Sequence, residues 1–307
     1  MSNLNKSGAT LFLLVILQAC TWGAPPSVGP TRDYSAPGSC KCGVTQVKSP
    51  RVIGGQPAKK NEFPWLVALF KHRSNRPFCG GTLLSSRTVL TAAHCRIYSN
   101  LQDYRVSVRE HNVIKVDGEV KMKVSSFTQF PTYKGQDGDF AIIQLDGDVP
   151  FSKTILPLCL PSTGINYDSV VATTVGWGSM GTPYSNPTTP YKVVLDTMTN
   201  RDCEELNQVY RPGDITSNMI CGGRSAKSPC RGSQIPSQLS FSMYSIFLGD
   251  SGGPLMIKKG NVYSLIGVVS WGNICYAGTK VPHVFARVSA QLEWIQGHIQ
   301  GKTCKKS

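Results

Sequence analysis

The pattern of apolar and polar positions predicts a chain built mainly of short β-strands. Residues 65–70 and 262–269 are runs of aliphatic and aromatic side chains, a composition typical of buried strands. Clusters of Gly, Pro and Asn separate such runs and predict turns. Only residues 290–300 show a helical period, with Leu292, Ile295 and Ile299 on one face. We therefore expect an all-β fold with a helix near the C-terminal end.

The first residues have the pattern of a secretion signal. Lys6 supplies a positive charge, an apolar run covers residues 9–19, and small residues follow at 20–24. The apolar run is shorter than the roughly 20 residues that a membrane-spanning helix needs. We therefore expect a signal peptide over residues 1–24, a secreted extracellular product and no membrane span.

Composition and cysteine content are typical of a globular extracellular protein. The 307 residues are 40% hydrophobic and 16% charged, which is enough apolar material to bury a core. Eleven cysteines indicate an oxidising compartment, and removal of Cys20 with the signal leaves an even number. The sequence contains no zinc-type cysteine pairs, no phosphate-binding loop and no dinucleotide fingerprint.

The chain is basic, with a net charge of +14. Five basic residues and one acidic residue precede Val52, so the part from Val52 onward keeps 27 basic and 17 acidic residues. Such a surplus attracts polyanions at low salt. A basic surface that serves solubility and has no dedicated partner explains the same composition. No specific nucleic-acid partner is expected.

Three separate stretches carry the residues needed for nucleophilic catalysis. Ser251 lies within Gly-Asp-Ser-Gly-Gly-Pro, His94 within Thr-Ala-Ala-His-Cys, and Asp139 within Asp-Phe-Ala-Ile-Ile-Gln-Leu. A serine hydroxyl needs a base to remove its proton. Histidine, with a pKa near 6.5, suits that role, and a carboxylate orients the imidazole. The chain order His, Asp, Ser distinguishes this set from hydrolases with other orders.

These motifs resemble those of the chymotrypsin/trypsin-like family of secreted serine endopeptidases. The similarity extends from Val52 to about residue 300 and includes Arg-Val-Ile-Gly-Gly at 51–55. It implies a protease domain over 52–307, built as two six-stranded antiparallel β-barrels and a C-terminal helix. Asp137 competes for the carboxylate role, but only Asp139 has the alanine and leucine spacing of the family.

The family pattern assigns roles to residues around the nucleophile. It implies that the backbone N–H groups of Gly249 and Ser251 form the oxyanion hole. Ser270, Trp271 and Gly272 resemble the segment that pairs with the substrate backbone as an added strand. The expected partners are protein or peptide substrates and protease inhibitors, and no cofactor is required.

The segment before the protease domain resembles a propeptide. Residues 25–39 are rich in Pro, Gly and Ser and read as a spacer within a linker over 25–51. Cleavage after Arg51 would free the ammonium group of Val52, which the resemblance pairs with Asp250. A buried pair of this kind is costly unless it is well formed, which suits a switch.

The resemblance also implies a set of disulfide bridges. Cys40 and Cys304 are the two cysteines left over after the others are paired, and we expect them to form a fifth bridge. A bridge from the propeptide to the protease domain would keep the two pieces attached after cleavage. The other expected pairs are Cys79–Cys95, Cys203–Cys221, Cys230–Cys275 and Cys42–Cys159.

The specificity pocket departs from the trypsin pattern. Ser228, followed by Pro229, stands where trypsin-like members carry an aspartate, so a buried substrate Lys or Arg would be left unpaired. Cleavage after Arg51 therefore requires a separate, upstream trypsin-like protease. His283 replaces a family glycine of the pocket wall, which includes Gly272. Its ring either forms a basic lining for acidic or polar P1 residues, helped by Arg231, or fills the pocket.

One loop has the composition of a calcium site in some relatives. Glu110, Asn112, Asp117 and Glu119 provide oxygen atoms at a density that suits a hard cation. Solvated loop charges without a metal explain the same residues.

Residues 232–248 separate Arg231 from the Gly249–Ser251 motif, where relatives have a direct connection. The segment is uncharged and partly apolar, which is unusual for a surface loop. Our hypothesis is a retained short intron, whose removal keeps the frame and restores Arg-Gly-Asp-Ser. If the segment is translated, it either bulges outward or disturbs the site. We therefore carry two hypotheses: a serine endopeptidase zymogen, and a catalytically impaired homologue that acts as a binding or regulatory module.

Overall fold

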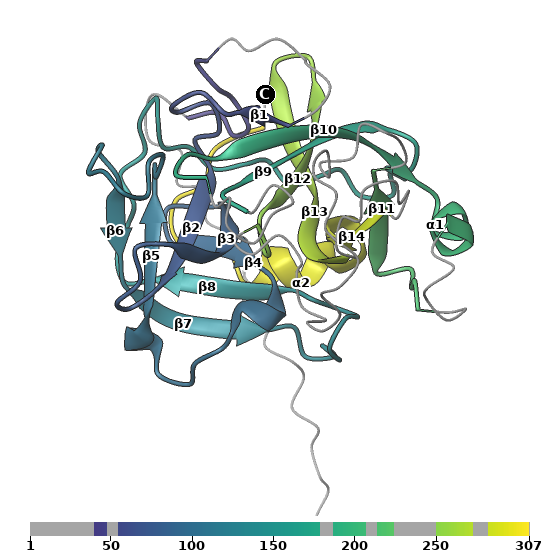
Figure 1. Cartoon of the computed structure of the whole chain (residues 1–307), viewed down its shortest axis with the longest axis horizontal. Coiled ribbons are helices and arrows are strands. Elements are labelled where there is room, and N and C mark those ends of the chain that lie inside the picture. Colours follow the sequence, from purple (N-terminus) through teal and green to yellow (C-terminus); the bar gives the residue numbers. More distant parts are fainter. Residues whose placement is uncertain are drawn as a thin grey trace, which may run out of the picture. The chain divides into compact units, whose positions relative to one another are not determined.

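The computed structural model describes six parts of the chain (Figure 1). They are residues 40–47, 55–178, 187–206, 214–223, 250–272 and 282–306. The expected signal peptide, the bond after Arg51 and the 232–248 segment lie outside them, so the predicted domain boundaries remain predictions. In the described residues, no helix combines the length and the apolar character needed to cross a membrane.

The first half of the described chain forms an antiparallel barrel. Its strands are β2 (Leu66–Lys71), β3 (Pro77–Leu83), β4 (Thr88–Thr91), β5 (Tyr104–Val108), β6 (Val120–Met122), β7 (Val124–Gln129) and β8 (Ala141–Leu145). Their spatial order is β6-β5-β2-β3-β4-β8-β7. Only Lys123 separates β6, which pairs with β5, from β7, which pairs with β8. These two strands are therefore arms of one bent strand, and the barrel is six-stranded.

The second half forms another antiparallel barrel. Its strands are β9 (Val171–Gly176), β10 (Tyr191–Met198), β11 (Met219–Gly222), β12 (Pro254–Lys259), β13 (Val262–Gly272) and β14 (His283–Arg287). The order β10-β11-β14-β13-β12-β9 closes on itself, because β9 also pairs with β10. The short strand β1 (Gln56–Pro57) adds to the outside of β10. The predicted all-β fold with two six-stranded barrels is therefore confirmed.

Among the described residues, helices are few and short. The predicted C-terminal helix is confirmed as a 3₁₀ turn, Val288–Gln291, followed by α2 (Leu292–Gly297). Leu292 and Ile295 are buried, as their spacing predicts, but the helix ends at Gly297 and does not include Ile299. The helix α1 (Asn200–Leu206) was not predicted. Among its residues only Cys203 is buried, so its sequence has no apolar stripe from which to infer a helix.

Disulfides tie the outer segments to the barrels. Cys40–Cys304 and Cys42–Cys159 attach residues 40–47 to the protease domain. Cys79–Cys95 joins β3 to the turn that carries His94, and Cys203–Cys221 joins α1 to β11. The expected bridge between Cys230 and Cys275 falls outside the described residues.

Candidate active site

A short turn after the end of β4 fixes the position of His94. It occupies the centre of the 3₁₀ turn Ala93–Cys95, and the Cys79–Cys95 bridge anchors this turn to β3. The side chain of Gln129 on β7 donates a 2.9 Å hydrogen bond to the carbonyl oxygen of Ala93. A fixed turn fixes the direction in which the imidazole leaves the backbone.

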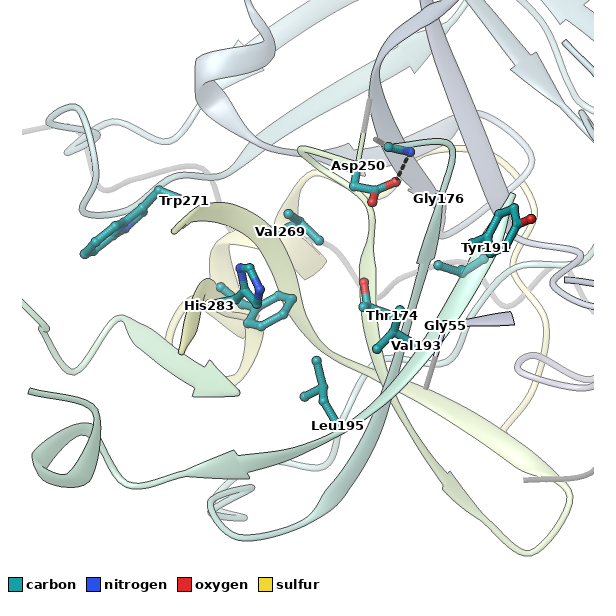
Figure 2. Close-up of a pocket in the computed structure, with 13 residues that line it drawn as sticks. Gly55, Thr174, Gly176, Tyr191, Val193, Leu195, Asp250, Val269, Trp271 and His283 are labelled. Carbon is teal, nitrogen blue, oxygen red and sulfur yellow. Dashed lines mark hydrogen bonds between the residues drawn. The ribbon is translucent and has the colours of Figure 1, made fainter. Parts of the chain in front are cut away.

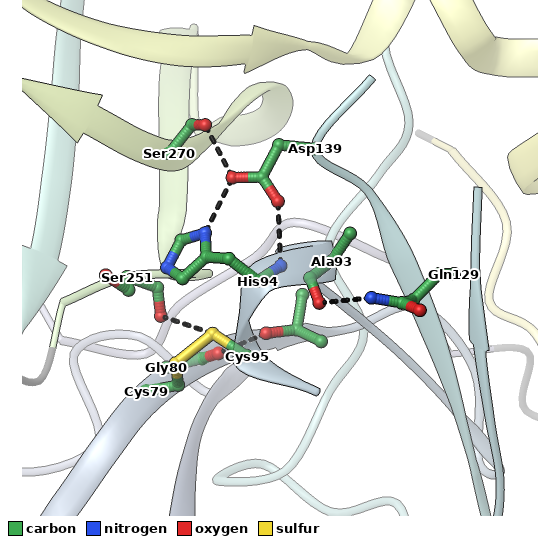
Figure 3. The surroundings of a disulfide bond; sticks show 10 residues. Cys79, Gly80, Ala93, His94, Cys95, Gln129, Asp139, Ser251 and Ser270 are labelled. Carbon is green, nitrogen blue, oxygen red and sulfur yellow. Dashed lines mark hydrogen bonds and ion pairs between the residues drawn. A yellow bond between two sulfur atoms is a disulfide. The ribbon is translucent and has the colours of Figure 1, made fainter. Parts of the chain in front are cut away.

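Asp139 binds both the backbone and the ring of His94 (Figure 3). Its Oδ1 accepts the backbone N–H of His94 at 3.0 Å, and its Oδ2 accepts the ring Nδ1–H at 2.7 Å. The carboxylate is 1% exposed, while the His94 side chain is 30% exposed. With the proton on Nδ1, the lone pair of His94 is on Nε2, which is the arrangement of a general base.

Ser270 on β13 makes a contact that the sequence did not reveal. Its hydroxyl donates a 2.5 Å hydrogen bond to Oδ2 of Asp139. The sequence assigned Ser270 a role through its backbone alone, together with Trp271 and Gly272, and all three lie at the end of β13. Because Ser270 is in the second barrel and Asp139 in the first, this bond also ties the two barrels together at the carboxylate.

Asp137, the rejected candidate for the catalytic carboxylate, binds elsewhere. Its Oδ1 accepts the hydroxyl of Thr216 at 2.5 Å, and both its oxygens accept from the side-chain amide of Asn218, at 3.2 and 3.1 Å. Thr216 and Asn218 precede β11 of the second barrel. Asp137 therefore fixes the loop that leads into Asp139 against the opposite barrel.

Ser251 lies in a tight turn between the barrels. Its carbonyl oxygen accepts a 2.7 Å hydrogen bond from the N–H of Gly80 on β3, and the N–H of Gly252 donates to the carbonyl of Val269 on β13 at 2.8 Å. Gly252 has a φ of +82°, and a Cβ there would lie 2.2 Å from the hydroxyl of Thr91. The glycine is therefore required by both its conformation and the close approach of the first barrel.

Figure 3 shows Ser251 on the side of the His94 ring that faces away from Asp139. In space, the hydroxyl of Ser251, the imidazole of His94 and the carboxylate of Asp139 therefore follow one another in that order. Among the described hydrogen bonds, none joins His94 to the hydroxyl of Ser251, and such bonds often form only when substrate is bound. Gly249, the other expected oxyanion-hole donor, lies outside the described residues.

Asp250, the residue before Ser251, lines a cavity of the second barrel (Figure 2). One of its oxygens accepts a 2.7 Å hydrogen bond from the backbone N–H of Gly178. Burial raises the pKa of the carboxyl to about 7, and the Gly178 bond only partly offsets that rise. The cavity is also lined by Gly55, which lies three residues after Val52. A cation brought in by that segment would stabilise the ionised form.

His283 lies in the wall of the same cavity (Figure 2). It is 7% exposed, and burial lowers the pKa of its imidazole to about 4, so the ring is neutral at physiological pH. A Cβ on Gly272 would lie 2.8 Å from Nδ1 of His283, so the ring packs directly against the glycine. Of the other expected pocket residues, Ser228, Pro229 and Arg231 lie outside the described part of the chain.

Three carboxylates gather in the loop between β5 and β6. Glu110, Asp117 and Glu119 bring one oxygen each within 4.8 Å of one another. One buried oxygen of Glu110 and one of Asp117 have no hydrogen-bond partner in the described residues. Burial raises the pKa of Glu110, the hydrogen bond from Ser107 partly offsets that rise, and the charges of the two other carboxylates add to it. The donor set therefore fits a hard cation. Asn112 instead caps its own loop by accepting from the N–H of Ile114.

Two lysines already supply positive charge to that loop. Lys60 Nζ lies 3.5 Å from Asp117, and Lys121 Nζ lies 3.2 Å from Glu119. Both ammonium groups are substantially exposed, so they can move aside with little loss of energy. Glu110 is the one member of the cluster to which no salt bridge is assigned among the described residues.

The family model named Trypsin matches residues 52–233 and 238–295. This chain belongs to the trypsin family. It is 32% identical over 269 residues to "Venom serine protease Bi-VSP" of Bombus ignitus, covering 82% of this chain and 69% of that relative. It is 34% identical over 264 residues to "Venom protease" of Bombus pensylvanicus, covering 79% and 96% respectively.

Family membership makes this trypsin relative a serine endopeptidase by class, which is a hydrolase of peptide bonds. Its protein substrates follow from the same membership. The family match begins at Val52 and skips residues 234–237, which lie within the unusual 232–248 segment.

Proposed function

We propose that this chain is the secreted precursor of a serine endopeptidase that cleaves peptide bonds through an acyl-enzyme on Ser251. The observation that carries the proposal is the 2.7 Å bond from His94 Nδ1 to a 1% exposed Asp139, with Ser251 on the far side of the ring. Four disulfides and venom-protease relatives support an extracellular setting.

The chemistry assigns one role to each residue. His94 Nε2 takes the proton of the Ser251 hydroxyl as Oγ attacks the substrate carbonyl, and the charge that develops on the imidazole is stabilised by Asp139. The same proton then passes to the leaving amine as the C–N bond breaks. Water next attacks the ester, gives its proton to His94, and releases the acid while Ser251 recovers its proton. The N–H of Ser251, with that of Gly249, would stabilise the oxyanion.

The activation step rests on Asp250. In the precursor its carboxyl is buried, with a pKa raised to about 7. Cleavage after Arg51 by an upstream trypsin-like protease frees the ammonium of Val52, close in sequence to Gly55 in the same cavity. The ion pair then forms where a lone carboxylate is costly. The turn that carries Ser251 is fixed as a result.

The decisive experiment is covalent labelling of Ser251. A peptidyl organophosphonate, applied after limited cleavage at Arg51, is expected to add to Ser251 and to leave S251A unlabelled. H94A should lower the labelling rate by several orders of magnitude, since the base is lost. Absence of labelling both in the cleaved chain and in a cleaved chain lacking residues 232–248 would refute the proposal.

The P1 preference follows from His283. Its buried, neutral ring packs against Gly272 and narrows the pocket, and Ser228 stands where trypsin-like members carry the aspartate that pairs with Lys or Arg. We therefore assign the pocket to small or polar uncharged P1 residues. A peptide library should show that preference, and H283G should extend cleavage to large aromatic P1 residues. Efficient cleavage after Arg or Glu by the unmodified enzyme contradicts this assignment.

The second candidate function is a catalytically impaired homologue that acts as a binding or regulatory module. The feature that favours it is the 232–248 segment, because an apolar insertion beside the oxyanion turn can misplace it, and about 1 Å of error costs roughly a hundredfold in rate. Deletion of 232–248, which joins Arg231 to Gly249, is the matched comparison. A large gain in kcat/KM on deletion assigns the impairment to this segment. Equal rates in the two cleaved forms exclude impairment.

The origin of the segment is a separate question that sequencing answers. The retained-intron hypothesis predicts transcripts in which residues 232–248 are absent and the reading frame is preserved. If every transcript from the locus encodes the segment, the intron hypothesis fails and the long form is the product.

A further inference from the structure

Three parts of the chain that are distant in sequence meet at one edge of the second barrel. They are the N-terminal segment 40–47, the hairpin formed by β12 and β13, and the C-terminal residues 299–306. Figure 1 shows the C-terminal end beside the tip of this hairpin. Each part brings lysine side chains to the surface. We call this surface the lysine face and define it by Lys41, Lys258, Lys305 and Lys306.

Backbone bonds hold the N-terminal and C-terminal parts side by side. Lys41 and Lys305 form a parallel β-bridge. The N–H of Cys42 donates to the carbonyl of Lys305 at 3.0 Å, and the N–H of Lys305 donates to the carbonyl of Cys40 at 3.0 Å. The Cys40–Cys304 disulfide closes the same contact covalently. Lys41 and Lys305 are therefore fixed neighbours.

The hairpin is joined to this pair through Gly43. The N–H of Tyr263 donates to the carbonyl of Gly43 at 2.8 Å. A Cβ on Gly43 would lie 2.1 Å from the carbonyl oxygen of Tyr263, so only a glycine allows this approach. Lys258 Nζ lies over the Tyr263 ring, 5.2 Å from its centroid. This places Lys258 at the edge of the same surface.

Lys306 continues the surface toward the next loop. Its Nζ lies 3.2 Å from the hydroxyl of Ser162 and 3.4 Å from the carbonyl oxygen of Leu160. Both partners are uncharged, so the ammonium charge is not neutralised. Lys41, Lys305 and Lys306 are exposed, and Lys258 is half-buried.

The lysine face contains no acidic residue. Residues 40–47, 152–163, 254–264 and 299–306 include no aspartate or glutamate. None of the four lysines has a carboxylate within salt-bridge distance in the described part of the chain. Lysines elsewhere, such as Lys60 and Lys121, do have one. Within the described residues, the charges of these four lysines are therefore not compensated by salt bridges.

We propose that the lysine face binds a sulfated polysaccharide. Lys41 and Lys305 are neighbours through their backbones, and ammonium groups that have no carboxylate partner create a positive potential that attracts a polyanion and releases its counterions. The extracellular setting proposed above makes sulfated polysaccharides the polyanion that this protein would meet. The proposal does not depend on catalysis, because no residue of the lysine face belongs to the candidate active site.

The composition of the surface favours a polysaccharide over a nucleic acid. All four cations are lysines, whereas arginine is the residue that recognises phosphate with two parallel hydrogen bonds. Tyr263 is the one aromatic residue in the four segments. Lys258 Nζ lies over its ring, so this face of the ring is not available for stacking on a base. Single-stranded nucleic acids are normally bound on exposed aromatic side chains.

The test compares two variants of the full chain with equal net charge. In one, Lys41, Lys258, Lys305 and Lys306 are all changed to Gln. In the matched control, four exposed lysines of the first barrel are changed to Gln: Lys71, Lys115, Lys123 and Lys134. Both are measured by elution from immobilised heparin in a salt gradient and by the salt dependence of heparin affinity. A DNA duplex serves as the comparison polyanion.

We expect the lysine-face variant to lose more than about tenfold in heparin affinity, and the control variant to lose much less. On DNA each neutralised phosphate contributes about 0.9 to the slope of log K against log salt. By the same counterion argument the slope for heparin should fall by about 3 to 4 in the lysine-face variant. Far-UV circular dichroism and the urea-unfolding midpoint should be unchanged in both variants, which shows that they fold independently of any catalytic activity.

Two outcomes overturn the proposal. If the two variants lose the same amount of heparin affinity, heparin binding depends on net charge alone and not on the lysine face. A loss of affinity for DNA as large as that for heparin means that the surface has no preference for sulfated sugars. K41Q on its own should produce a measurable part of the loss, because it removes one of the four charges.

Discussion

At the scale of single residues, the carboxylate of Asp137 helps to position the carboxylate of Asp139. It accepts hydrogen bonds from Thr216 and Asn218 in the second barrel, two positions before the carboxylate that binds His94. Sequence spacing correctly separated Asp137 from Asp139, but it could not supply the function of Asp137. The partners are 79 and 81 residues away along the chain, and no local pattern records such contacts.

The first prediction concerns this residue. D137A should lower kcat by about ten- to a hundredfold with little change in KM, because the loop that positions Asp139 loses its anchor. D137N should retain most of the activity, since an amide oxygen still accepts from Thr216. Steady-state kinetics on the cleaved form lacking residues 232–248 gives the measurement. A kcat for D137A equal to that of the parent would show that the anchor has no catalytic effect.

The Ser270 hydroxyl was likewise missed, for the same reason. Its bond to Asp139 crosses 131 positions of sequence. The resemblance pointed to the backbone of Ser270, and nothing in the local sequence distinguishes a serine that faces solvent from one that binds a buried carboxylate. Only the three-dimensional closure of the barrels reveals the difference.

The second prediction concerns Asp250 in the uncleaved precursor. Its folded pKa of about 7 lies above the ordinary value of 3.8, so the folded state holds a proton that the unfolded state has already lost between those values. Stability from this group therefore falls as pH rises from about 4 to 7, by up to about 1.4 kcal/mol per unit. D250N should flatten this part of the curve, as measured by urea unfolding at a series of pH values.

His283 has the opposite effect on the pH dependence of stability, so its contribution must be measured separately from that of Asp250. Its folded pKa of about 4 lies below 6.5, so its contribution is lost on acidification through that window. H283F removes the contribution, and comparing both variants with the parent resolves the two slopes. A D250N profile parallel to that of the parent would mean that Asp250 is already ionised and paired in the precursor.

At the scale of elements, the strands were more predictable than the helices. β2 and β13 follow from apolar runs bounded by turn residues, because burial in a barrel demands apolar side chains. The helix α1 has seven residues, of which only Cys203 is buried. Its stability therefore comes from the Cys203–Cys221 bridge and from packing rather than from an amphipathic pattern. The division of one bent strand into β6 and β7 at Lys123 likewise left no mark in the sequence.

The third prediction concerns the loop between β5 and β6. If Glu110, Asp117 and Glu119 bind calcium, saturating Ca²⁺ should raise Tm, since about 2.7 kcal/mol accompanies a hundredfold excess over Kd. Chelation should reverse the effect, and E110Q should abolish the response, because it removes the carboxylate to which no lysine is paired. Differential scanning calorimetry with Ca²⁺ and with chelator provides the measurement. A Tm that is insensitive to both would indicate a loop of solvated charges.

At the scale of the whole molecule, the segment 40–47 is bound twice to the rest of the chain. Its two disulfides start from Cys40 and Cys42, which are two positions apart, and end at Cys304 and Cys159, which are far apart in sequence. The backbone bonds between Cys42 and Lys305 add a third attachment that is not covalent. Cleavage after Arg51 therefore should not release the segment that precedes it.

The fourth prediction follows from this arrangement. After cleavage, electrophoresis without reductant should show one species, and reduction should separate a short fragment from the protease domain. C40S and C42S should each remain attached through the other bridge, whereas the double variant should lose the fragment without reduction. Loss of the fragment in either single variant would mean that one of the bridges does not form.

The double attachment has a practical consequence for detecting the protein in a biological fluid. An antibody raised against residues 40–47 would recognise the inert and the processed molecule equally, since that epitope stays in place. Such a reagent would report how much protein is present and nothing of how much has been switched on. Only a probe for the newly exposed amino group at Val52 would count the molecules that had been processed.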